Sequence, residues 1–148
     1  MLPWQKGNLQ YLHSMNTKLI MALSALLLAL VGLAFTFFGA ELAVFTGTGL
    51  SVTFQLILQL LGALYVGFAM LNWMAKGSAI GGIYNRPIAI ANFAHFFIGG
   101  MALLKVVFNH PGVSPAIWAL ALVYLLFAFL FGYIVFFRSP VTKQAVQS

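Results

Sequence analysis

Residues 19–38 read LIMALSALLLALVGLAFTFF, a stretch of 20 residues with no charged side chain. Each residue of an α-helix adds 1.5 Å, so about 20 residues cross a hydrocarbon layer that is about 30 Å thick. Three more stretches of similar character follow, at 52–75, 87–108 and 115–137. All four are apolar on every side, which argues against strands of a membrane β-barrel, where apolar residues alternate over about 10 positions.

The composition of the whole chain also indicates that lipid is its solvent. Hydrophobic residues make up 63% of the 148 residues and charged residues only 5%, whereas about 25% of the residues of a soluble domain are charged. So few polar side chains could not cover a surface that faces water. The sequence therefore predicts an all-α integral membrane protein in which four transmembrane helices form one bundle.

The four stretches also predict the domain organisation. Residues 1–18 are expected to form an N-terminal segment in the cytoplasm or at the interface, and Met15 is an alternative start. Residues 19–138 form the transmembrane domain, and residues 139–148 form a cytoplasmic tail. The first stretch could instead be a signal peptide, but its apolar run exceeds the usual length of about 7–15 residues, so we expect a retained helix.

Positive charges predict the orientation of the chain. Six of its seven Lys and Arg residues flank the apolar stretches on one side of the membrane: Lys6, Lys18, Lys76, Arg86, Arg138 and Lys143. The opposite connections, 39–51 and 109–114, contain neither Lys nor Arg. Because short loops rich in Lys and Arg stay in the cytoplasm, we expect both termini and the 76–86 connection on the cytoplasmic side of the membrane.

The net charge of +6 would suggest nucleic-acid binding in a soluble chain. Here the cations lie next to apolar stretches, which instead predicts contacts with the headgroups of anionic lipids and no nucleic-acid partner. Lys76 and Arg86 are the candidate headgroup contacts. The glycine-containing connection between them could also cradle a phosphate, although it lacks the residue order of a Walker A loop. A simple flexible connection is the favoured interpretation.

Three polar residues in the cytoplasmic half of the membrane are candidates for a functional site. Asn72 lies near the end of the second stretch, and Asn92 and His95 lie near the start of the third. Antiparallel neighbouring helices could bring Asn72 against Asn92 or His95. An interhelical hydrogen bond, which contributes about 0.6 kcal/mol on average, is favoured over a polar site or proton relay that opens to the cytoplasm.

A second candidate cluster lies on the outer side. Glu41 is the only acid of the chain, and Lys105 is the only cation within the third stretch. Lys105 could extend its ammonium group to the interface, or it could pair with Glu41. Gln59 would then complete a Glu41–Gln59–Lys105 cluster. A further alternative is that Glu41 carries protons or contacts a substrate.

The sequence predicts no metal, no cofactor and no catalytic residue. The chain contains no cysteine, which excludes thiolate ligands and thiol chemistry. His95 has no second strong ligand at a spacing that would help it to bind a metal ion.

Small residues are expected to pack the helices, with self-association as the alternative. They are Ala25, Ala29 and Gly32 in the first stretch, Ala63 and Gly67 in the second, and Ala128 and Gly132 in the fourth. A short pattern, Tyr65-x-x-Phe68-Ala69, returns at 124–128. It indicates either a duplicated helical hairpin or a chance match between apolar sequences.

Two segments stand out within this plan, Leu61-Gly62-Ala63-Leu64-Tyr65 and Asn92-Phe93-Ala94-His95. With these segments, four spans, cytoplasmic ends and short connections, the chain resembles small bacterial inner-membrane proteins of the DoxX-like kind. The resemblance covers residues 19–137 and implies the four-helix fold. It implies no catalytic residue, because a shared fold does not identify an activity.

Three classes of function remain open. The leading hypothesis is a non-enzymatic accessory, assembly or lipid-interacting component, as a homo-oligomer or within a larger membrane complex. The first alternative is an oligomeric transporter or channel for a small solute or protons, which would use the two polar clusters described above. The second is a membrane enzyme that acts on a lipid or a quinone with His95 as acid or base. We do not expect an enzyme.

Overall fold

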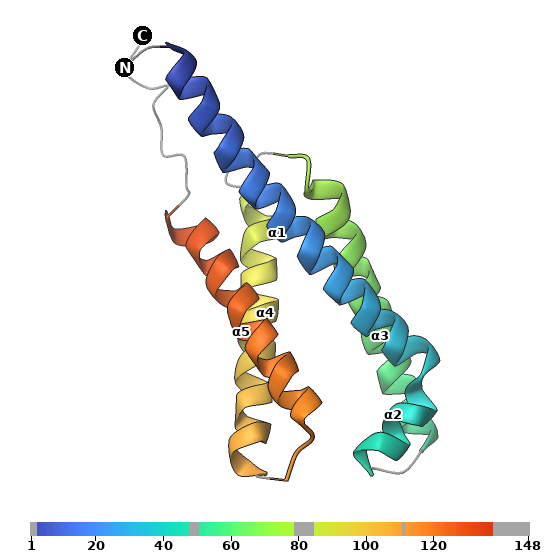
Figure 1. The fold of residues 1–148 in the computed structure, drawn as a ribbon. Helices are drawn as coiled ribbons and strands as arrows, with labels where there is room; N and C mark the ends of the chain where they lie inside the picture. The colour runs from blue at the N-terminus through green and yellow to red at the C-terminus, as the bar shows by residue number, and fades with distance from the viewer. Residues whose placement is uncertain (1–2, 48–50, 79–84, 111, 138–148) are drawn as a thin grey trace. The chain divides into compact units, whose positions relative to one another are not determined.

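The computed structural model describes residues 3–47, 51–78, 85–110 and 112–137, with side chains from Thr17 onward except that of Thr46. Within these ranges the chain forms five helices and no strand (Figure 1). They are α1 (Pro3–Phe37), α2 (Gly39–Thr46), α3 (Val52–Ala75), α4 (Arg86–Asn109) and α5 (Pro115–Phe137). Four segments are long and apolar enough to cross a membrane: Thr17–Phe37, Val52–Ala75, Arg86–Asn109 and Pro115–Phe137. The prediction of an all-α fold with four membrane-crossing helices is confirmed.

The chain divides into two compact units, Met1–Gly77 and Ser78–Ser148. In the first unit α1 packs against α3, and the short helix α2 joins them. In the second unit α4 packs against α5. Each unit is a helical hairpin, because its two long helices run in opposite directions along each other (Figure 1). The sites in each hairpin are described separately below.

The first helix begins earlier than the sequence analysis predicted. We expected its start at residue 19, but α1 continues without a break from Pro3 to Phe37. Pro3 itself is acceptable there, because a proline in the first turn of a helix loses no hydrogen bond. Once a long helix exists, each further residue adds one hydrogen bond without a new nucleation cost. The more polar segment before Thr17 therefore extends the helix, and its location at the interface stays a prediction.

The connection between α1 and α3 contains a helix that the sequence analysis did not predict. This helix, α2, ends at Gly47, whose φ of 67° is a left-handed conformation that glycine adopts without strain. Four residues later the Oγ atom of Ser51 accepts a hydrogen bond of 3.1 Å from the backbone N–H of Phe54 and so caps α3. Gly47 therefore ends α2 and Ser51 caps the start of α3.

Large apolar side chains cover much of the surface of the two hairpins. Val52 is 85% exposed, Met74 78% and Phe129 73%. Soluble proteins rarely expose contiguous apolar patches larger than a few hundred Å². A surface of this kind therefore needs lipid or other transmembrane helices around it, in agreement with the composition of the chain.

Candidate functional site

The first hairpin is held together by a close crossing of two glycines. A Cβ atom added to Gly32 would lie 2.9 Å from the carbonyl oxygen of Gly62, and one added to Gly62 would lie 2.7 Å from the carbonyl oxygen of Gly32. The hydroxyl of Thr36 donates a hydrogen bond of 2.8 Å to that same oxygen of Gly32. The predicted packing role of Gly32 is confirmed, but Gly62 was not predicted as its partner. Gly67 has no atom within 4 Å of an added Cβ and takes no part in this crossing.

Asn72, a candidate of the intramembrane polar site, is engaged within the first hairpin. Its Nδ2 atom donates a hydrogen bond of 3.1 Å to the Oγ atom of Ser24. The hydroxyl of Ser24 in turn donates a hydrogen bond of 2.9 Å to the carbonyl oxygen of Met21. Both Asn72 and Ser24 are 0% exposed. Sequence reasoning missed Ser24, although it and Thr36 are the only polar residues of the first apolar stretch.

The other two candidates lie on α4 in the second hairpin. Asn92 is completely buried, and its Nδ2 atom donates a hydrogen bond of 2.9 Å to the carbonyl oxygen of Ile88, one turn earlier in α4. The ring of His95 lies 5.2 Å from that of Phe96 and 5.8 Å from that of Tyr124, measured between centroids. The Nε2 atom of His95 is buried. The predicted approach of Asn72 to Asn92 or His95 would join the two units, and it stays a prediction.

An aromatic core lies beside His95. The ring of Phe96 stacks on Phe127 at 4.9 Å and on Phe131 at 5.8 Å, and it meets Tyr124 edge-on at 5.2 Å. Gly99 makes room for Tyr124, because a Cβ atom at Gly99 would lie 2.8 Å from the Cε1 atom of that ring. The second hairpin is therefore packed through aromatic side chains rather than through direct backbone contact.

Small residues of α5 also contribute to this core, as predicted. Ala128 is 4% exposed, and Gly132 is buried. A Cβ atom at Gly132 would lie 3.1 Å from the ring of Phe93 in α4. The predicted packing role of Ala128 and Gly132 is confirmed within this hairpin.

The residues of the predicted outer cluster are all exposed. Glu41 lies on α2 and Gln59 on α3, in the first unit, whereas Lys105 lies on α4 in the second. The structure places α2 beside α3 but leaves the side chains of Glu41 and Gln59 at the surface. A pair between Glu41 and Lys105 would join the two units, and it stays a prediction.

Two cations share one end of the first hairpin. The Nζ atom of Lys76 lies 2.8 Å from the centroid of the Trp73 ring, an arrangement that favours cation–π attraction. Partial desolvation of the ammonium group lowers the pKa of Lys76 from its usual value, and the positive charge of Lys18 lowers it further. The sequence analysis did not predict that Lys18 and Lys76 would be neighbours.

The other candidate headgroup contact, Arg86, is the exposed first residue of α4. Residues 79–84 of the connection that precedes it lie outside the described residues. The hypothesis that its glycines cradle a phosphate therefore stays a prediction.

Within the described ranges no three His, Asp or Glu side chains come close enough together to hold a metal ion. The side chains of Asn72, Asn92 and Thr36 bond to the neighbouring helix or to the backbone of their own helix. No protein-family model, curated protein or solved structure matches this chain. Membership of the DoxX-like proteins stays a prediction.

Proposed function

We propose that this chain is a non-enzymatic accessory or assembly component of a bacterial inner membrane, with the four-helix plan of the DoxX-like proteins. The main support for the proposal is that polar side chains within the apolar helices form hydrogen bonds inside their own hairpin. Asn72 bonds to Ser24 across the first hairpin, and Asn92 bonds to the backbone of its own helix. Such bonds stabilise helix packing, whereas transport and catalysis need polar groups around a hydrated cavity.

The exposed side of α3 supports a role in association with another transmembrane helix. Only 17% of the apolar window of α3 is buried, compared with 44% for α5. Ala63 and Gly67 are exposed there at a spacing of four residues, and Leu60 and Leu64 flank them. Small residues at this spacing let the backbone of a second helix approach closely. A homo-oligomer or a larger membrane complex would use this surface.

Photo-crosslinking in native membranes tests the proposal. A photoreactive residue at Leu64, which is 55% exposed, is expected to give one reproducible protein adduct, either with a second copy or with a partner. The matched control is the same residue at Phe96, which is 0% exposed and should give no intermolecular adduct. Adducts with lipid alone at Leu64 would contradict an accessory role.

A transport assay tests the main alternative. The purified full-length chain in liposomes is expected to move neither protons nor small solutes. Flux that disappears in the variants Asn72→Leu and His95→Phe, while the helical content of the protein is unchanged, would overturn the proposal in favour of a transporter.

We further propose that both termini are cytoplasmic. The proximity of Lys18 and Lys76 at one end of the first hairpin supports this orientation, because clustered cations favour the cytoplasmic side. The chain has no native cysteine, so single cysteines can be introduced at two exposed positions, Ser78 and Gly112. In intact cells a membrane-impermeant maleimide should label Gly112→Cys and should label Ser78→Cys only after permeabilisation. The reverse result would invert the orientation.

A further inference from the structure

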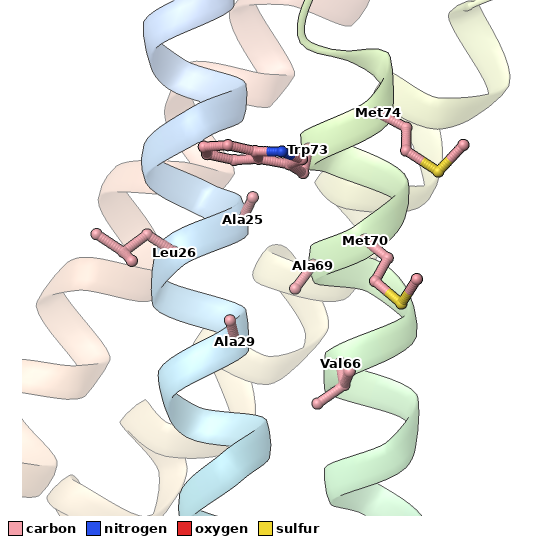
Figure 2. A pocket seen from close by; sticks show the side chains of 8 residues that line it. All are labelled: Ala25, Leu26, Ala29, Val66, Ala69, Met70, Trp73 and Met74. Atoms are coloured by element: carbon pink, nitrogen blue, oxygen red, sulfur yellow. The ribbon is translucent and has the colours of Figure 1, made fainter.

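An apolar groove of about 380 Å³ runs between α1 and α3 (Figure 2). Its lining includes the small side chains of Ala25 and Ala29 from α1 and Ala69 from α3. Figure 2 shows the indole ring of Trp73 reaching from α3 toward α1 at one end of the groove, with Val66 toward the other end. The volume lies within the range of pockets that hold small ligands, about 300–1,000 Å³.

Two positive charges stand at the Trp73 end of this groove. Lys18 precedes Ala25 by seven residues, and Lys76 follows Ala69 by seven residues. Seven residues are about two helical turns, so each lysine lies on the groove side of its helix, about 10 Å beyond the alanine. The Nζ atom of Lys76 contacts the Trp73 ring. Ser24 of α1 bonds to Asn72 of α3, so Lys18, which precedes Ser24, and Lys76, which follows Asn72, lie toward the same end of the hairpin. In agreement, the positive charge of Lys18 contributes to lowering the pKa of Lys76.

We propose that this groove binds one acyl chain of an anionic phospholipid, and that the lipid phosphate lies between Lys18 and Lys76. An acyl chain matches an apolar groove that is lined by alanine, valine and methionine side chains. A phosphate would relieve the repulsion between the two ammonium groups, because it brings the opposite charge to both of them. The tryptophan ring lies between chain and headgroup, which is the depth that indole rings prefer in membranes.

Charge complementarity selects this occupant over a protein helix. An apolar helix in the groove, whether from a second copy or from α4 or α5, would leave two neighbouring cations without an opposite charge. A phospholipid with a neutral zwitterionic headgroup would compensate them less completely. The inference depends on the membrane location of the chain but not on its accessory role. Its test by lipid binding is separate from the crosslinking experiment above.

Quenching of Trp73 fluorescence by a lipid with brominated acyl chains tests the site. The full-length chain with Trp4→Phe and Trp118→Phe retains Trp73 as its only tryptophan. Brominated phosphatidylglycerol, added to vesicles of phosphatidylcholine, should quench Trp73 to saturation at a low lipid fraction. Unbrominated phosphatidylglycerol should compete for the site. Brominated phosphatidylcholine should quench only in proportion to its bulk fraction.

Charge variants test the phosphate contact. A lysine near an anionic headgroup favours binding about fivefold, so Lys18→Gln should weaken the preference for phosphatidylglycerol about fivefold and the double variant with Lys76→Gln about 25-fold. The matched controls Lys18→Arg and Lys76→Arg retain the charge and should retain the preference. Lys105→Gln removes a cation from the other hairpin and should also leave the preference unchanged.

Four outcomes would overturn the proposal. Equal quenching by the two brominated lipids in the parent protein would exclude an anionic-lipid site. Absence of quenching by either lipid would show that protein covers the groove. Efficient disulfide formation between copies that carry Ala29→Cys would identify a second copy as the occupant. Because Lys18 is exposed, Lys18→Gln should fold even if the double variant does not, and an unchanged preference in Lys18→Gln would also contradict the site.

Discussion

The side-chain amide of Asn72 donates a hydrogen bond of 3.1 Å to the hydroxyl of Ser24, and both residues are completely buried between α1 and α3. The two residues are 48 positions apart in the sequence, so this bond fixes the register of the first hairpin. In hydrocarbon an unpaired amide would have no water to bond to, so this bond favours the observed packing of α1 against α3.

Replacement of Asn72 tests the strength of this bond. We expect Asn72→Ala to destabilise the first hairpin, and a double-mutant cycle with Ser24→Ala to give a coupling energy of about 0.6 kcal/mol and at most about 1.7 kcal/mol. The measurement is the unfolding free energy in mixed micelles. Additive effects of the two substitutions would contradict the bond.

The close approach of Gly32 and Gly62 predicts that Gly62→Ala, which adds one methyl group, destabilises the first hairpin more than loss of the Asn72–Ser24 bond does. Gly62→Ala places a Cβ atom 2.7 Å from the carbonyl oxygen of Gly32 and 3.0 Å from the backbone nitrogen of Thr36, so the helices must move apart. Overpacking of this kind costs about 1–3 kcal/mol.

The control for this experiment lies in the same helix. Gly67→Ala meets nothing within 4 Å and should be neutral or slightly stabilising, because alanine favours helix more than glycine does. Unfolding measured by circular dichroism would compare the two variants. Equal stability of both would show that the helices do not approach closely at Gly62.

The four spans could be predicted from the sequence because length and apolar composition alone determine which segments cross a bilayer. The residues through which the helices contact each other could not be predicted. Ala63 and Gly67 show the spacing that is typical of helix contacts, yet the contact of the first hairpin uses Gly62. In segments that are apolar on all sides, no periodic pattern marks the inner face. The fit between the surfaces of α1 and α3 where they cross then determines which small residue is buried.

The repeated pattern around Tyr65 and Tyr124 illustrates the same point. In both hairpins a glycine of the preceding long helix faces the tyrosine: Gly32 lies against the Cβ atom of Tyr65, and Gly99 lies against the ring of Tyr124. The short pattern in the sequence therefore has a counterpart in packing. The hydrogen bond of Asn72 has no counterpart in α5, where the corresponding residue is Phe131. The structure, and not the repeated pattern, shows that the first hairpin has a polar pair in its interior and the second an aromatic core.

The aromatic core of the second hairpin predicts a contrast between two phenylalanines. Phe96 is 0% exposed and contacts the rings of Phe127, Phe131 and Tyr124, whereas Phe129 is 73% exposed. Phe96→Ala should destabilise this hairpin by about 3–5 kcal/mol, because it removes many contacts and leaves a cavity. Phe129→Ala should change stability much less, because lipid replaces the lost ring. Thermal unfolding of both variants would check this, and similar losses would contradict the assignment of the core.

Because Lys18 contributes to the low pKa of Lys76, replacement of Lys18 should change this pKa. Lys18→Gln removes the smaller of the two causes that lower the pKa of Lys76, so this pKa should rise. It should stay below the usual value of about 10.4, because partial desolvation of the ammonium group remains. Lys18→Arg retains the charge and should leave the pKa of Lys76 low. Nuclear magnetic resonance of ¹³C-methylated lysines would follow the titration, with Lys76→Arg to assign the signal.

The same titration determines how the stability of the first hairpin depends on pH. A lowered pKa means that the unfolded chain binds more protons than the folded one, so stability rises as the pH increases through the lowered pKa of Lys76 toward the usual value for lysine. Below that lowered pKa the full electrostatic penalty is present and constant. In Lys18→Gln this rise should begin at higher pH and be smaller. An identical pH profile in the two proteins would show that Lys18 and Lys76 do not interact.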